Sequence, residues 1–193
     1  ISISHITQNT DGKSISFITS INNPDTTDLP TEKEIIYKES FESDISNIMT
    51  INSISGKDKW KTYKKGDFTI NPELIPEPTD GNKIMMLFSS KGNTISESEI
   101  ISEQIDVNVG TDYSFTFDIC CNTISSSPKF EISIIDDYGE YNIYSNKKII
   151  NTWETISIPL TFAYDKFSYK LYGLIGSGGI YIDNIRLTKN IPF

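Results

Sequence analysis

Aromatic side chains are the residues of this chain whose chemistry best suits ligand recognition. Pyranose rings stack on exposed tryptophan or tyrosine rings, while polar neighbours bind the sugar hydroxyl groups. Trp153 is the first candidate because strand alternation places it on an outward face with Thr155 and Ser157. A tryptophan partly buried at a sheet margin is the competing interpretation. The remaining aromatic candidates for sugar binding are Tyr138, Tyr141, Tyr144 and Trp60.

Catalytic chemistry finds little support in the sequence. His5 is the only histidine and lies in a separate N-terminal segment, which disfavours a Ser-His-Asp or Cys-His arrangement. The segment from Glu131 to Asp136 is similar to the Glu-x-Asp-x-x-Glu strand of laminarinase-type glycosidases, but Ser133 replaces its central carboxylate. A glycosidase needs two facing carboxylates. We therefore expect no enzymatic activity, and a concanavalin-like glycoside hydrolase is a remote alternative.

The cysteines and the glycine-rich loop have structural interpretations. Cys120 and Cys121 are adjacent, so on a strand their side chains point to opposite faces and cannot easily bond each other. They also lack the Cys or His neighbours of a zinc site. The Gly176–Gly179 segment lacks the lysine of a phosphate-binding loop, and we expect a turn there.

The charge of the chain disfavours two classes of partner. Acidic residues number 26 and basic residues 17, which gives a net charge of -9. Such a field repels nucleic acid and anionic membrane surfaces. No apolar run approaches the ~20 residues of a membrane helix, and residues 1–10 lack the features of a signal peptide. We expect no membrane insertion by this segment, and an export signal that was either removed or never part of this sequence.

Period-two alternation runs through most of the chain and predicts antiparallel strands. The clearest strand runs from Tyr113 to Cys121, with its odd-numbered residues in the core and its even-numbered residues in solvent. Inward positions are also expected at Phe130, Ile132, Ile134, Ile156, Ile158 and Leu160. Further strands are expected near 35–41, 67–71, 82–89, 99–107, 141–145, 168–175 and 179–187. Turn signals every ~8–12 residues then indicate two stacked sheets or a barrel.

Residues 1–34 are predicted to form an N-terminal hairpin and linker. The turn signal Asn9–Gly12 lies between two alternating segments, and the stretch Asn22–Pro30 has the Pro and Asp content of a linker. We interpret this part as the end of a preceding domain, with extra edge strands on the main sandwich as the alternative. Residues 35–193 then form one binding module of ordinary domain size.

Several segments of the module follow the order of a group of bacterial surface domains. They are Tyr37–Glu42, Gly56–Trp60, Asp80–Leu87, Glu97–Val107, Phe115–Asp118 and Gly179–Leu187. In this order they resemble the cleaved-adhesin and choice-of-anchor type domains of Bacteroidetes, which are related in fold to MAM domains and carbohydrate-binding modules. The segment Glu97–Val107 departs from the "Trp-Leu-Ile-Ser-Pro" pattern of many members, because it lacks the Trp and the Pro.

The resemblance implies an all-β jelly-roll sandwich of the galactose-binding or concanavalin-like kind. It also implies a structural calcium ion held by Glu42 near the first strand and Asp183 in the last, with help from backbone carbonyls and from Asp44, Asp80 or Asn184. The competing interpretation is that Glu42 and Asp183 pair with a lysine or cap a turn. The resemblance further implies an extracellular or outer-surface location, free or lipid-anchored.

These observations favour a non-catalytic surface module that binds a glycan. The alternative is an adhesin that binds a surface protein, or a structural spacer domain of a surface lipoprotein. Two or more exposed aromatic side chains in one groove would favour glycan binding.

Overall fold

The structure is a computed structural model of the chain. It describes residues 2–8, 15–20, 33–43, 45, 49–56, 58–64, 75–89, 95–123 and 128–189, with backbone only for 2–8, 15–20 and 123. The chain divides into two compact units, Ile1–Glu32 and Lys33–Phe193. In the first unit, β1 (Ser2–Gln8) pairs antiparallel with β2 (Ile15–Ser20). The structure therefore does not describe the side chain of His5.

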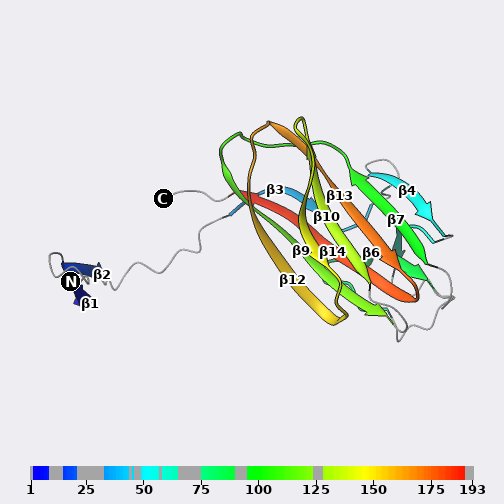
Figure 1. The fold of residues 1–193 in the computed structure, drawn as a ribbon, viewed down its shortest axis with the longest axis horizontal. Coiled ribbons are helices and arrows are strands. Elements are labelled where there is room, and N and C mark those ends of the chain that lie inside the picture. The colour runs from blue at the N-terminus through cyan, green and yellow to red at the C-terminus, as the bar shows by residue number, and fades with distance from the viewer. Residues whose placement is uncertain are drawn as a thin grey trace. The chain divides into compact units, whose positions relative to one another are not determined.

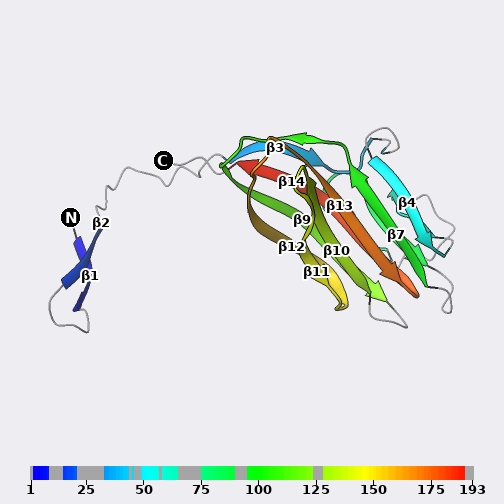
Figure 2. The same cartoon turned by 45° about the horizontal axis from the view of Figure 1, so that its top comes forward.

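The second unit consists of two six-stranded antiparallel sheets (Figures 1 and 2). The first sheet has the order β11-β10-β13-β7-β4, with β8 paired to β13, and the second has the order β12-β9-β14-β6-β5, with β3 paired to β14. The strands of the first sheet are β4 (Met49–Ser55), β7 (Ser96–Ser102), β8 (Ile105–Asp106), β10 (Lys129–Asp136), β11 (Gly139–Asn146) and β13 (Lys166–Ile175). Those of the second are β3 (Glu34–Glu39), β5 (Lys61–Lys64), β6 (Lys83–Ser89), β9 (Asp112–Thr123), β12 (Ile150–Thr161) and β14 (Gly178–Lys189). This architecture confirms the predicted antiparallel sandwich.

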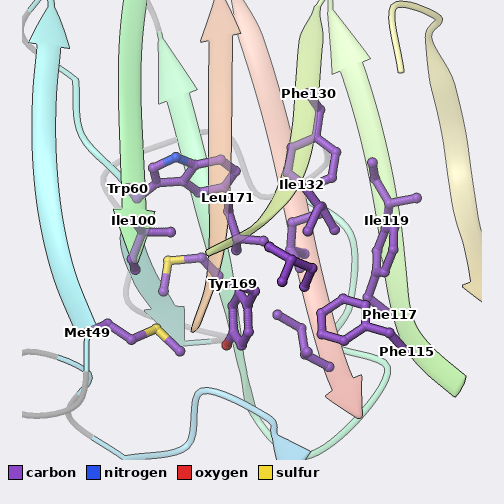
Figure 3. Close-up of a cluster of buried hydrophobic side chains, with 14 of the residues drawn as sticks. Met49, Trp60, Ile100, Phe115, Phe117, Ile119, Phe130, Ile132, Tyr169 and Leu171 are labelled. Atoms are coloured by element: carbon purple, nitrogen blue, oxygen red, sulfur yellow. The ribbon is translucent and has the colours of Figure 1, made fainter. Parts of the chain in front are cut away.

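Aromatic and aliphatic side chains from both sheets form the main core (Figure 3). Phe117 of β9 packs against Phe130 of β10 and Tyr144 of β11, with ring centroids 6.2 Å and 5.2 Å apart. The five odd-numbered residues from Tyr113 to Cys121 are all buried, as the alternation predicts. Ile156, Ile158 and Leu160 of β12 are partly buried against the same core, so their inward direction is also correct.

The prediction of a solvated outer face on β9 is wrong toward the end of that strand. Asp118 and Cys120 are buried, and Cys120 belongs to a second hydrophobic cluster with Met86 of β6 and Tyr181 of β14. Ile75 and Trp153 pack against this cluster. The second sheet is therefore covered on both faces at this end, which the alternation of a single strand cannot reveal.

Several strand boundaries differ from the sequence expectations. The expected strand at 99–107 is two strands, β7 and β8, and the strand expected near 67–71 lies outside the described residues. Strands β4 and β5 have no sequence counterpart among the predictions. Among the described residues, no helix has the length and apolar character needed to cross a membrane.

Candidate functional site

A row of polar side chains around one tyrosine crosses the outer face of the first sheet. Strand pairing places Ser145, Glu131, Tyr172, Glu99 and Asn52 opposite one another on β11, β10, β13, β7 and β4. Four gaps between neighbouring strands give this Tyr172 row a span of about 19 Å. Lys129, Lys170 and Glu97 flank the row, and the eight residues together are called the Tyr172 face.

Hydrogen bonds join the β7 side of the Tyr172 face to its neighbours. The Tyr172 hydroxyl donates to Glu97 Oε1 over 2.5 Å, and Ser55 Oγ donates to the other oxygen of Glu97 over 3.2 Å. The Asn52 amide donates to Glu99 Oε1 over 3.0 Å. These contacts fix the tyrosine ring and two carboxylates in one layer above the sheet.

Two lysines form ion pairs on this face. Lys129 Nζ lies 2.9 Å from Glu131 Oε2 and 5.0 Å from the centroid of the Tyr172 ring. Lys170 Nζ lies 2.5 Å from Glu140 Oε1 and 3.8 Å from Glu99 Oε2. The side chains of Lys170 and Glu99 are only 17% and 21% exposed, so neighbouring atoms cover most of this ion pair.

The environment of Tyr172 keeps its phenol protonated. Partial burial of the ring, followed by the hydrogen bond to Glu97 and the charges of Glu97 and Glu131, raises the pKa of Tyr172 above its ordinary value. The hydroxyl is therefore a hydrogen-bond donor over the whole neutral range.

The core tryptophan positions the strands that carry the Tyr172 face. Trp60 Nε1 donates to the Ser98 carbonyl of β7 over 3.0 Å, between Glu97 and Glu99. Gly173 of β13 faces inward beside the same indole, and a Cβ atom there would lie 2.8 Å from Trp60 Cζ2. The close approach of Trp60 thus requires a glycine next to Tyr172.

The aromatic residues selected from the sequence do not gather in one place. Trp60 is 1% exposed and lies in the core, and Tyr144 is partly buried against the same core. Trp153 is half-buried over the second hydrophobic cluster, where its Nε1 donates to the Glu77 carbonyl over 2.7 Å. Only Tyr138 and Tyr141 are exposed, at 87% and 40%, on the β10–β11 hairpin.

Tyr172 was missed by the sequence analysis, although a signal for it was present. In the segment from Phe167 to Tyr172, the residues Phe167, Tyr169 and Leu171 are apolar and buried. The same alternation places Tyr172 outward with Lys170. The charged residues beside Tyr172 come from neighbouring strands, so they cannot be identified without the strand order.

The carboxylates predicted to hold calcium bind backbone amides of the turn before β6. Asp183 is fully buried, and its Oδ2 accepts the N–H groups of Thr79 and Asp80 over 2.7 Å and 2.9 Å. Glu42 Oε1 accepts the N–H groups of Asn82 and Lys83 over 2.5 Å and 2.7 Å. Burial raises the pKa of Asp183 above its ordinary value, against the opposing effect of these hydrogen bonds.

In this arrangement the carboxylates predicted to hold calcium bind groups of the protein itself. Amide hydrogens point at Asp183 Oδ2 and Glu42 Oε1, and Asp80 pairs with Lys38 at 2.6 Å. No group of three or more His, Cys, Asp or Glu in the described part of the chain could hold a metal ion. Asp44 lies outside the described residues. Calcium binding stays a prediction from the sequence.

Comparison with solved structures relates the fold to carbohydrate-binding and adhesin domains. The CBM22-1 xylan-binding domain of Paenibacillus barcinonensis Xyn10C matches 83% of this chain and 97% of its own, with a TM-score of 0.54 and 9% identity. The K2 cleaved adhesin domain of Lys-gingipain matches 79% of this chain and 97% of its own, with a TM-score of 0.55 and 14% identity. These identities establish the similarity of fold alone.

A third structure contains a catalytic module beside the similar domain. It is the CBM22-1 and GH10 modules of Clostridium thermocellum xylanase 10B complexed with xylohexaose, with a TM-score of 0.51, 12% identity and 83% of this chain covered. The match covers only 30% of that longer chain. No family model matches this protein, and no curated protein matches it in sequence.

Proposed function

We propose that residues 33–193 form a non-catalytic module that binds a neutral glycan on the Tyr172 face. The observation that carries this proposal is the central Tyr172 ring, surrounded by carboxylate, amide and ammonium groups on neighbouring strands. Sugar recognition combines an aromatic surface with hydrogen-bonding groups of this kind. The similarity of fold to a xylan-binding domain supports the same proposal.

The charge of the face favours an uncharged sugar. Three glutamates and two lysines lie on the Tyr172 face, within a chain of net charge -9. Uronic acids and sulfated sugars would meet a net negative field. Charged side chains still make strong hydrogen bonds with neutral hydroxyl groups.

Binding without hydrolysis is supported by the arrangement of the carboxylates. Glu131 and Glu99 flank Tyr172, but each lies in an ion pair with a lysine, whereas a glycosidase needs one carboxyl that stays protonated to act as an acid. The laminarinase-like segment is also not assembled into a pair of facing acids. Its Asp136 instead accepts the N–H of Tyr138 in the hairpin turn, over 2.9 Å.

A glycan array followed by calorimetry tests the proposal with a matched pair of tyrosine variants. Tyr172→Ala removes the ring from the proposed site, and Tyr138→Ala removes an exposed ring from the hairpin. We expect Tyr172→Ala to weaken binding by about tenfold or more, which corresponds to ~1.4 kcal/mol, and Tyr138→Ala to bind like the wild type. A folded Tyr172→Ala variant with unchanged affinity would refute the proposal.

The exposed hairpin supports a second candidate function, adhesion to a surface protein. Tyr138 and Tyr141 present aromatic surface beside Asp136, and exposed tyrosines are frequent in protein interfaces. Under this alternative the array gives no signal. The double variant Tyr138→Ser/Tyr141→Ser then loses adhesion, while Tyr172→Ala retains it.

An exported or surface-attached location belongs to the same proposal. The two kinds of ligand proposed here are polysaccharides and surface proteins, and both occur outside the cell.

A further inference from the structure

The ring of Tyr172 already has a cation over it, supplied by the protein itself. Lys129 Nζ lies 5.0 Å from the ring centroid, within the ~6 Å range of a cation–π contact. The same ammonium lies 2.9 Å from Glu131 Oε2. A carboxylate and an aromatic ring thus hold one lysine side chain over the surface on which a sugar would stack.

The ring itself has little freedom to move away from the lysine. Its hydroxyl donates to Glu97, which also accepts from Ser55 on β4. The lysine, in contrast, is held by two weak contacts, because its side chain is 36% exposed and water screens both the ion pair and the cation–π contact. The lysine is therefore the part that moves when another group takes its place.

Lys170 provides the internal comparison. It lies on the same face and pairs with Glu99 and Glu140, yet the structure gives it no contact with the Tyr172 ring. Its side chain is 17% exposed, about half the value for Lys129. The two lysines share a charge and a face but differ in their relation to the ring.

We propose that Lys129 is a displaceable cover of Tyr172 that sets the affinity of the site for neutral glycans. This inference rests on the proposed function. A neutral sugar that stacks on the ring must first displace the ammonium and break its ion pair with Glu131. High salt weakens that pair, so salt favours binding of the neutral sugar. This dependence is opposite in direction to that of a site that attracts its ligand by charge.

Calorimetric titration with xylohexaose tests whether Lys129 covers the ring. The wild type is compared with Lys129→Ala and with the control Lys170→Ala. We expect Lys129→Ala to bind about two- to fivefold more tightly than the wild type, which is the conversion of the ~0.5–1 kcal/mol of an exposed cation–π contact. We expect the wild type to gain affinity as salt rises, and Lys129→Ala to show no such gain. Lys170→Ala should bind no more tightly than the wild type.

The outcomes separate this inference from the proposed function. Equal or weaker binding by Lys129→Ala would show that the lysine does not compete with the sugar, while glycan binding itself would stand. Binding by Lys129→Ala when the wild type does not bind would support the cover. If neither protein binds xylohexaose or any neutral glycan of an array, both the inference and the proposed function are overturned.

Discussion

Gly173 links the core to the candidate site, and Gly173→Ala tests that link. A Cβ atom at this position would lie 2.7 Å from Leu87 Cδ2 and 2.8 Å from Trp60 Cζ2, well inside ordinary contact. Trp60 cannot easily retreat, because it is 1% exposed and its Nε1 donates to Ser98. Adding a methyl group to a filled core costs about 1–3 kcal/mol. We expect Gly173→Ala to lose that much free energy of unfolding.

Urea denaturation followed by circular dichroism measures this loss, and a double-mutant cycle identifies its cause. Phenylalanine in place of Trp60 removes Trp60 Cζ2, one of the two atoms that the new methyl group would meet, and leaves Leu87 Cδ2 in place. We therefore expect Gly173→Ala to cost at least about 0.5 kcal/mol less in a Trp60→Phe background than in the wild type. A loss below ~0.5 kcal/mol for the single variant, or simple additivity of the two changes, would refute the reasoning.

Four further predictions concern the core, the thiols, the second cluster and the proposed metal. Phe117→Ala should cost about 3–5 kcal/mol in urea denaturation, and a loss below ~1 kcal/mol would mean that the faces of β9 are reversed. Burial raises the pKa of Cys120 to about 11 and that of Cys121 to about 12, so a thiol reagent at pH 8 should label them only after unfolding. Since the folded state keeps both thiols protonated, their contribution to stability is complete below pH 9 and is lost as the pH rises toward 11 to 12. Trp153→Ala should lose about 1–3 kcal/mol of free energy of unfolding, because its packing and its hydrogen bond are lost. It should retain glycan binding in calorimetry, and loss of binding in a folded variant would show that Trp153 belongs to the binding site. Excess chelator should leave the melting temperature unchanged if Asp183 serves only the backbone, whereas a lower value would support calcium.

The alternation of β9 made much of the fold predictable. Phe115 and Phe117 alternate with polar residues over a long strand, and a period of two has one structural explanation. Strand β5 is short, and its neighbour in the sheet is set by distant residues, so no local pattern indicates it. The burial of Cys120 is also non-local, because the cluster that covers it comes from β5, β6, β14 and β12.

The candidate site was harder to predict than the fold for the same reason. Trp60 and Trp153 have the residue type of sugar-binding side chains, but residue type does not distinguish a core indole from an exposed one. The Tyr172 row exists only because β13 lies between β10 and β7, which are distant in sequence. Strand order, and not composition, brings Glu131 and Glu99 to either side of the ring.

An NMR titration of the isotopically labelled protein with a neutral oligosaccharide from the array tests the central claim most directly. Ring stacking and hydroxyl hydrogen bonds at Tyr172 should shift the amide signals of β10, β13 and β7 around Glu131, Tyr172 and Glu99. Signals of the hairpin turn around Tyr138 and of the β12 segment near Trp153 should stay in place. Shifts confined to either of those regions, with the Tyr172 row unchanged, would contradict the account.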